Sequence, residues 1–220
     1  MADPTQIAVF FGAGRSLSCP LAPVLALAPQ TTPGEPKKVD RPDGLPYGRS
    51  CMYKIVLDAD GLIKTYKAGF LPQLTAEYVC LLPEEVYQEA VVAARISHAD
   101  EARALEHLIA EENLIRKQAA HSRVADRILR GSHSLGMGES GAVRLFLQAG
   151  ADVLLSDDRA FLSFLTRHRI PFLTPSEALL SLRTANRLSY QDAARAAEQL
   201  RPLIRRNVYE DLRTRLERLR

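Results

Sequence analysis

The chain is short of cysteine and of long apolar runs, and both shortages exclude classes of protein. Its three cysteines, Cys19, Cys51 and Cys80, are odd in number and lack metal-ligand spacing. We therefore expect no zinc site, and we predict a reducing, cytoplasmic setting. No apolar stretch approaches the ~20 residues that cross a bilayer. The run IAVFFGAG is short and has neither a basic region before it nor a clear cleavage site after it, so we predict no signal peptide and no membrane partner.

Net charge is also scarce. The formal net charge of +3 is too small for the whole surface to attract nucleic acid without selectivity. Positive charge gathers at one end, where residues 201–220 hold seven arginines against Glu210, Asp211 and Glu217. This stretch is either a patch that contacts phosphates or the solvated face of a helix, and the pattern favours the solvated face.

Proline is abundant in one part of the chain. Residues 1–51 contain eight of the thirteen prolines and show no sustained hydrophobic period. Such a stretch cannot bury enough apolar surface to offset the entropy lost on ordering. We therefore predict a disordered, Pro-rich N-terminal segment at 1–51. Met52 directly precedes the first strand pattern, so a natural start at this residue is the alternative.

From Tyr53 onward, strand patterns alternate with helix patterns. Short apolar runs predict strands at 53–58, 77–82, 152–156 and 170–173. Amphipathic or capped segments predict helices at 61–69, from Pro83 onward, and at 99–115, 138–150, 159–168, 174–182, 189–200 and 201–220. Strands separated by helices favour right-handed crossovers, so we predict an α/β fold with a mostly parallel central sheet flanked by helices. We expect one domain at 52–186 and a helical C-terminal extension at 187–220.

Five acidic residues stand where an apolar run ends or a helix opens: Asp58, Glu89, Glu139, Asp157 and Asp158. No nucleophile or histidine competes with them. Carboxylates gathered in one place repel one another and raise each other's pKa unless a cation lies between them. Mg²⁺ and Mn²⁺ prefer such oxygen ligands, and ligands of parallel sheets bind beyond the carboxyl ends of the strands. The pattern predicts a metal-dependent site that acts on phosphates.

Four segments in order resemble the PIN-domain ribonucleases: YKIVLDADGLIKTYKAG, PEEVYQEAVV, LGMGESGAVRLFLQAGADVLLSDDRAFLSFL and IPFLTPSEAL. In that family an Asp ends the first strand, a Glu lies in the helix after the second strand, and a third acid opens the helix before the next strand. A fourth acid, an Asp, follows that strand in a Thr/Ser-x-Asp context. The resemblance covers residues 52–182 and places these four roles on Asp58, Glu89, Glu139 and Asp158. Asp157 is open either as a residue that shares or replaces the role of Asp158, or as the cap of the helix at 159–168.

PIN domains are small α/β folds whose acids bind one or two Mg²⁺ or Mn²⁺ ions and hydrolyse single-stranded RNA. The resemblance implies that Asp58 and Asp158 are direct metal ligands, and that Glu89 and Glu139 complete the pocket directly or through waters. Many small bacterial members are VapC-type toxins, so an antitoxin protein and a second copy in a homodimer are the implied protein partners. The chain departs from the family at Asp60, where a small hydroxyl or amide residue is usual. Asp60 either adds a ligand or faces solvent.

Two alternatives stay open beside this reading. The run IVLDADG also resembles the first motif of haloacid-dehalogenase-like phosphatases, in which Asp58 would be the nucleophile. That family usually has Thr where this chain has Leu62, and it needs a lysine shortly before the last acidic pair, whereas the nearest lysine before that pair is Lys117. The second alternative is an RNA-binding PIN-like module with little catalysis.

Removal of residues 1–51 tests the prediction of a disordered N-terminal segment. We expect the melting temperature of the shortened chain to stay within ~2 °C of that of the full chain, because a segment without packed side chains contributes little to stability. Differential scanning calorimetry of both proteins measures this. A large drop in the melting temperature would show that the segment packs on the rest of the protein.

Overall fold

The computed structural model describes residues 53–96, 99–111, 114–130 and 135–220. The predicted disordered segment at 1–51 lies outside the described residues, and so do Met52, Cys19 and Cys51. The third cysteine, Cys80, is buried and free, and its burial raises the pKa of the thiol to about 12. Cys80 is therefore an inert core residue.

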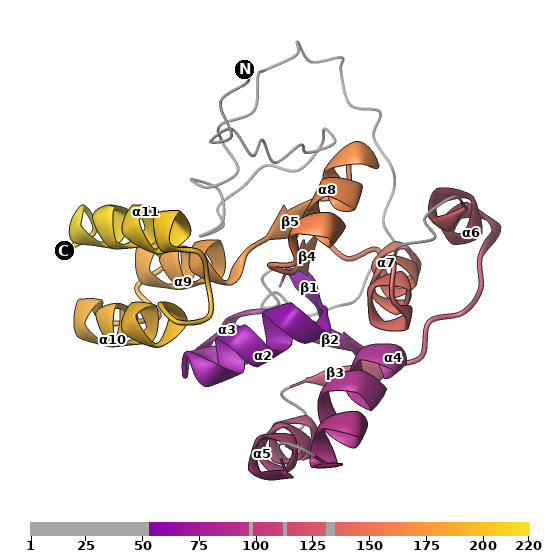
Figure 1. The fold of residues 1–220 in the computed structure, drawn as a ribbon, viewed down its shortest axis with the longest axis horizontal. Coiled ribbons are helices and arrows are strands. Elements are labelled where there is room, and N and C mark those ends of the chain that lie inside the picture. The colour runs from indigo at the N-terminus through magenta and orange to yellow at the C-terminus, as the bar shows by residue number, and fades with distance from the viewer. Residues whose placement is uncertain (1–52, 97–98, 112–113, 131–134) are drawn as a thin grey trace, which may run out of the picture.

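A parallel five-stranded sheet forms the centre of the described chain (Figure 1). Its strands are β1 (Lys54–Leu57), β2 (Val79–Pro83), β3 (Ile115–Lys117), β4 (Val153–Leu155) and β5 (Phe172–Leu173), in the order β3-β2-β1-β4-β5. Every neighbouring pair is parallel. The predicted α/β class with a parallel central sheet is confirmed.

Strand β3 is the strand that the sequence analysis did not find. The helix expected at 99–115 ends at Ala110, and Ile115 instead pairs with Leu81 of β2. Leu114 and Ile115 continue the apolar spacing of the preceding helix, so periodicity could not separate the two elements. All three residues of β3 are exposed, so the strand lacks the apolar run that marks a buried strand in the sequence.

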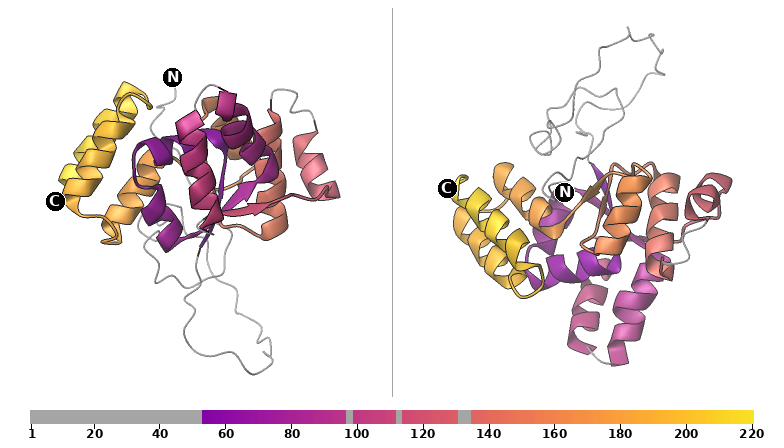
Figure 2. Two further views of the ribbon diagram at one scale, coloured as in Figure 1. Left: turned by 90° about the horizontal axis from the view of Figure 1, so that it is seen from below. Right: turned by 45° about the horizontal axis from the view of Figure 1, so that its top comes forward.

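Helices connect the strands and cover both faces of the sheet (Figures 1 and 2). They are α2 (Ala59–Lys67), α3 (Leu71–Glu77), α4 (Glu84–Tyr87), α5 (Ala99–Ala110), α6 (Arg123–Leu129), α7 (Met137–Ala149), α8 (Arg159–Arg167), α9 (Pro175–Thr184), α10 (Tyr190–Leu200) and α11 (Arg206–Glu217). After α4 the chain continues as a wider π-helical turn, η1 (Gln88–Val92), and a tighter 3-10 turn, η2 (Ala93–Ile96).

Two short helices and one boundary differ from the expectation. Helices α3 and α6 were not predicted, because seven residues give too few turns for a hydrophobic period to stand out. The closing helix, expected at 201–220, begins at Arg206 after a turn that contains Pro202. Pro202 has no backbone N–H to donate, which favours a break near this position.

Alternating side chains of the strands are buried in two apolar cores, one on each face of the sheet. Ile55 and Leu57 of β1 face one core, which is shared with α2, α3, α9, α10 and α11. Val56 faces the other core, which is formed mainly with α7 and α8. Because successive side chains of a strand point to opposite faces, the short run IVL packs against helices on both sides of the sheet.

The carboxyl ends of β1 and β4 are held at a fixed register. Leu57 lies opposite Leu155, and the N–H of Asp58 donates to the carbonyl of Leu155 at 3.1 Å. Helix α2 starts immediately after β1 and crosses this edge, where a Cβ on Gly61 would stand only 2.4 Å from the same carbonyl oxygen. Glycine at 61 therefore lets α2 approach the end of β4.

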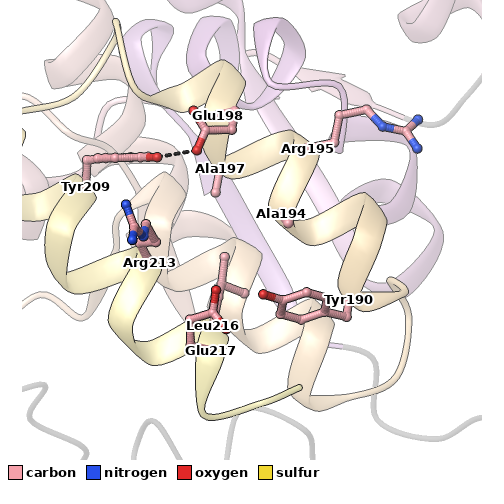
Figure 3. Close-up of a pocket in the computed structure, with 9 residues that line it drawn as sticks. All are labelled: Tyr190, Ala194, Arg195, Ala197, Glu198, Tyr209, Arg213, Leu216 and Glu217. Atoms are coloured by element: carbon pink, nitrogen blue, oxygen red, sulfur yellow. Dashed lines mark hydrogen bonds between the residues drawn. The ribbon is translucent and has the colours of Figure 1, made fainter.

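The last two helices pack on the rest of the described chain. Helix α10 contacts α9 and α2, and α11 contacts α9 and α10, while Leu200 and Leu212 join the core beside α2 and α9. Figure 3 shows the seam between α10 and α11, where the hydroxyl of Tyr209 donates to Glu198. The division of the chain at residues 186 and 187 stays a prediction. No helix in the described part is both long enough and apolar enough to cross a bilayer.

The contact of Gly61 with β4 predicts a costly substitution. We expect Gly61→Ala to lower the stability by about 1–3 kcal/mol, because the new methyl group meets a backbone carbonyl that cannot move freely. Thermal unfolding followed by circular dichroism measures the loss. Gly138→Ala is the matched control, since its Cβ would crowd only the far end of the flexible Glu89 side chain and would lie at an ordinary contact distance of 3.5 Å from Val86. An equal or smaller loss for Gly61→Ala than for this control would contradict the packing argument.

Candidate active site

Asp58 is the buried centre of the acidic edge. It follows β1 directly and caps α2, where its Oδ1 accepts the N–H of Gly61 at 2.7 Å. Its Oδ2 accepts the hydroxyl of Ser156 at 2.5 Å, and the residue is only 3% exposed. Burial raises the pKa of the carboxyl to about 7, against the lowering effect of these two hydrogen bonds, and the charges of Asp60 and Glu139 raise it further. Burial thus disfavours the charged form of Asp58, which a nearby positive charge would stabilise.

Ser156 is a site residue that the sequence analysis did not single out. Its buried hydroxyl donates to Asp58 and accepts the N–H of Asp158 at 3.2 Å. One side chain thus ties the end of β1 to the turn after β4. The signal for it was present, because Ser156 is the hydroxyl residue of the Ser-x-Asp context that surrounds Asp158.

Glu139 and Asp158 each lie at the start of a helix. The Oε2 of Glu139 accepts the N–H of Gly136 at 2.7 Å in the first turn of α7. The Oδ1 of Asp158 accepts the N–H of Phe161 at 2.8 Å at the start of α8. Helix starts favour negative charge. Among the described residues, the second oxygen of each carboxylate has no hydrogen-bond partner, so each is free to accept a ligand.

Glu89 approaches the same place from η1. A Cβ on Gly138 would lie 2.6 Å from Oε2 of Glu89, so the carboxylate rests against the first turn of α7, next to Glu139. Burial raises the pKa of Glu139, the N–H of Gly136 lowers it, and the charges of Asp158 and Glu89 raise it again. The charges of Glu89 and Asp158 therefore both act on Glu139.

Asp157 does not cap α8, because Asp158 is the capping residue, and it instead interacts with a different set of charges. Its Oδ2 accepts the ammonium of Lys64 at 2.7 Å, and the same ammonium donates to Oδ2 of Asp60 at 2.8 Å. Burial raises the pKa of Asp157, Lys64 lowers it, Asp60 raises it, and Arg205 lowers it. Asp60, left open by the sequence as a ligand or a solvent-facing residue, is thus an ion-pair partner of Lys64. The four-residue spacing of Asp60 and Lys64 on one helix was the available signal for their contact.

Asp58, Glu89, Glu139 and Asp158 form one group, since Glu139 acts on Asp58 and is acted on by the other two. No ion pair among the described residues neutralises these four. In the described ranges, no three histidine, cysteine or acidic side chains already stand in ready metal-binding positions. The donors nevertheless fit a hard divalent cation, because they are carboxylates. Burial is the largest cause of the raised pKa values of Asp58 and Glu139, and the charges of neighbouring carboxylates add to it.

The fold and the site together define an α/β protein with a cluster of carboxylates at the carboxyl edge of a parallel sheet. A family model described as a PIN domain matches residues 54–211. The chain belongs to the PIN-domain family, whose members have a nuclease-type fold. No curated protein matches the chain, and no solved structure matches it.

The buried carboxyl of Asp58 predicts a pH-dependent stability without metal. Its pKa rises from 3.8 to about 7 in the folded protein, so between these values the folded state holds a proton that the unfolded chain releases. This stabilisation is complete below about pH 4 and is lost as pH rises through about pH 7. In EDTA we therefore expect the melting temperature of the wild type to fall relative to that of Asp58→Asn, by on the order of a few degrees, between about pH 5 and pH 8.

Thermal melts of both proteins across this pH range measure the difference. The raised pKa of Glu139 affects wild type and variant alike, so the difference between the two curves reports on Asp58. Parallel curves would show that Asp58 does not hold its proton in the folded state.

Proposed function

We propose that the protein is a divalent-metal-dependent endoribonuclease that hydrolyses phosphodiester bonds of single-stranded RNA in the cytoplasm. Asp58, Glu89, Glu139 and Asp158 are its proposed acidic site. The observation that carries the proposal is the convergence of these four carboxylates, from four separate elements of a PIN-domain chain, without an ion-pair partner among the described residues. The choice of RNA follows from the resemblance to PIN-domain ribonucleases.

Asp58 and Asp158 would hold Mg²⁺ or Mn²⁺ directly, with Glu89 and Glu139 completing the site directly or through water. When bound, the cation supplies Lewis acidity to the phosphodiester and to the attacking water. Ser156 would hold Asp58 in one orientation, because its hydroxyl donates to one carboxylate oxygen while Gly61 donates to the other. Gly136 and Phe161 would do the same for Glu139 and Asp158. Side chains fixed in this way lose little freedom when substrate binds.

The arrangement gives less support to Asp58 as a phosphatase nucleophile. Both carboxylate oxygens of Asp58 accept hydrogen bonds, and the residue is nearly inaccessible. Each oxygen keeps a lone pair with which it can bind a cation, whereas a nucleophile must also be reached by the phosphorus atom of a bulky ester. The other alternative, a binding module with little catalysis, would leave four clustered carboxylates without a purpose and with mutual repulsion to overcome.

A toxin role is a narrower form of the proposal. It requires an antitoxin that covers the acidic edge, and a homodimer is a further proposed state. Expression of the wild type should then arrest growth of the host, and expression of Asp58→Asn should not. Arrest by both proteins would point to a cause other than RNA cleavage.

Cleavage of a mixed single-stranded RNA tests the central proposal. We expect cleavage with Mg²⁺ or Mn²⁺, none with EDTA, and a loss of at least about 100-fold in Asp58→Asn and in Asp158→Asn, since each change removes one ligand charge at nearly constant shape. Gel analysis of a labelled RNA measures the rates. Wild-type cleavage by both variants would overturn the assignment.

Two controls separate the alternatives. Circular dichroism should show that both variants keep the fold. Para-nitrophenyl phosphate tests the phosphatase alternative, and strong turnover of this ester without RNA cleavage would favour that chemistry over the proposed one.

A further inference from the structure

Lys64 divides the acidic side chains at the carboxyl edge of the sheet into two groups. Its ammonium lies 2.7 Å from a carboxylate oxygen of Asp157 and 2.8 Å from one of Asp60. Lys64 and Asp157 are 15% and 11% exposed at their side chains, so water screens their ion pair only partly. None of the ion pairs that involve Lys64 reaches Asp58 or Asp158.

The two groups differ in their charge balance. Asp60 and Asp157 carry two negative charges, and Lys64 and the nearby Arg205 carry two positive charges. Arg205 lies in the turn between α10 and α11, and its charge acts on Asp157. This group is compensated within the chain. The group around Asp58 has four carboxylates and no ion-pair partner among the described residues, so an added cation would stabilise this group.

Adjacent residues in the chain therefore have opposite surroundings. Asp157 points its carboxylate to Lys64, whereas Asp158 caps α8 and has one oxygen without a hydrogen-bond partner among the described residues. If Asp157 turned toward Asp58 and Asp158, its carboxylate would leave the ammonium of Lys64. The half-buried lysine would then have one ion-pair partner fewer, which is unfavourable. The ion pair thus opposes the binding of a cation by Asp157.

We propose that Lys64 is a positioning residue that holds Asp157 and Asp60 away from the catalytic cation and leaves the ligand role after β4 to Asp158. This inference rests on the proposed function. It distinguishes Asp157 from Asp158, which the sequence left open, and it gives Asp60 a structural partner in place of the small residue usual in the family.

Binding of Mn²⁺ to the full chain, followed by the electron paramagnetic resonance of free Mn²⁺, tests the proposal without depending on activity. With Lys64 present, Asp158→Asn should weaken binding by about tenfold or more, as loss of a ligand does, while Asp157→Asn should change it by less than about twofold. In Lys64→Met the freed carboxylates should tighten binding several-fold. Addition of Asp157→Asn to that variant should reverse the gain.

Lys64→Arg is the matched control, because the substitution keeps the positive charge. The variant should bind Mn²⁺ like the wild type. A purely stabilising role of Lys64 predicts a lower melting temperature in Lys64→Met but no new dependence of Mn²⁺ binding on Asp157. That result overturns the proposal, and so does equal weakening by Asp157→Asn and Asp158→Asn in the presence of Lys64. The comparison of Asp157→Asn with Asp158→Asn leaves Lys64 unchanged. It therefore tests the proposal even if Lys64→Met does not fold.

Failure of the proposed function has a different signature. If Mn²⁺ does not bind the wild type and RNA is not cleaved, the metal-dependent site itself is wrong, and the inference about Lys64 falls with it. If Mn²⁺ binding and RNA cleavage both depend on Asp58 while Asp157 matters as much as Asp158, only the inference about Lys64 is wrong.

Discussion

The parallel pairing of β1 with β4 is the constraint on which the acidic edge depends. With Leu57 opposite Leu155, the next residues of the two strands, Asp58 and Ser156, are brought within hydrogen-bond distance. The hydroxyl of Ser156 then connects Asp58 to the backbone of Asp158. Because a shift by one residue would turn each side chain to the opposite face of the sheet, the same register that buries the apolar core also brings Asp58, Ser156 and Asp158 together.

Burial of Asp58 is unfavourable for folding, and in the proposed function it favours the binding of a cation. The carboxyl loses water, and its pKa rises for that reason. Two hydrogen bonds offset part of this cost, and the remainder favours a cation that binds only the folded protein. Beside it, Lys64 compensates Asp60 and Asp157 within the chain. One edge of the sheet therefore holds a group whose charges are compensated next to the group around Asp58, whose negative charges are not. The proposed chemistry belongs to the group around Asp58.

Much of the fold could be predicted because its signals are local. Four strands appear as apolar runs, and caps such as Thr174 before Pro175 mark helix starts. The elements that were missed lack such signals. Strand β3 has no buried side chain, α3 and α6 are too short to show a period, and the π-helical turn that carries Glu89 has no pattern of its own. Their conformations follow from pairing and packing with distant parts of the chain.

The sequence by itself determined the class of fold, the order of the acids and the resemblance to a nuclease family, because these depend on residue type and spacing. It also indicated that Asp58 ends a strand. Only the tertiary structure decided what surrounds each acid. Lys64 and Asp157 are 93 positions apart, and Ser156 and Asp58 are 98 apart. The surroundings that distinguish Asp157 from Asp158 arise from contacts across the sheet, and a contact between residues so distant leaves no trace in local composition or period.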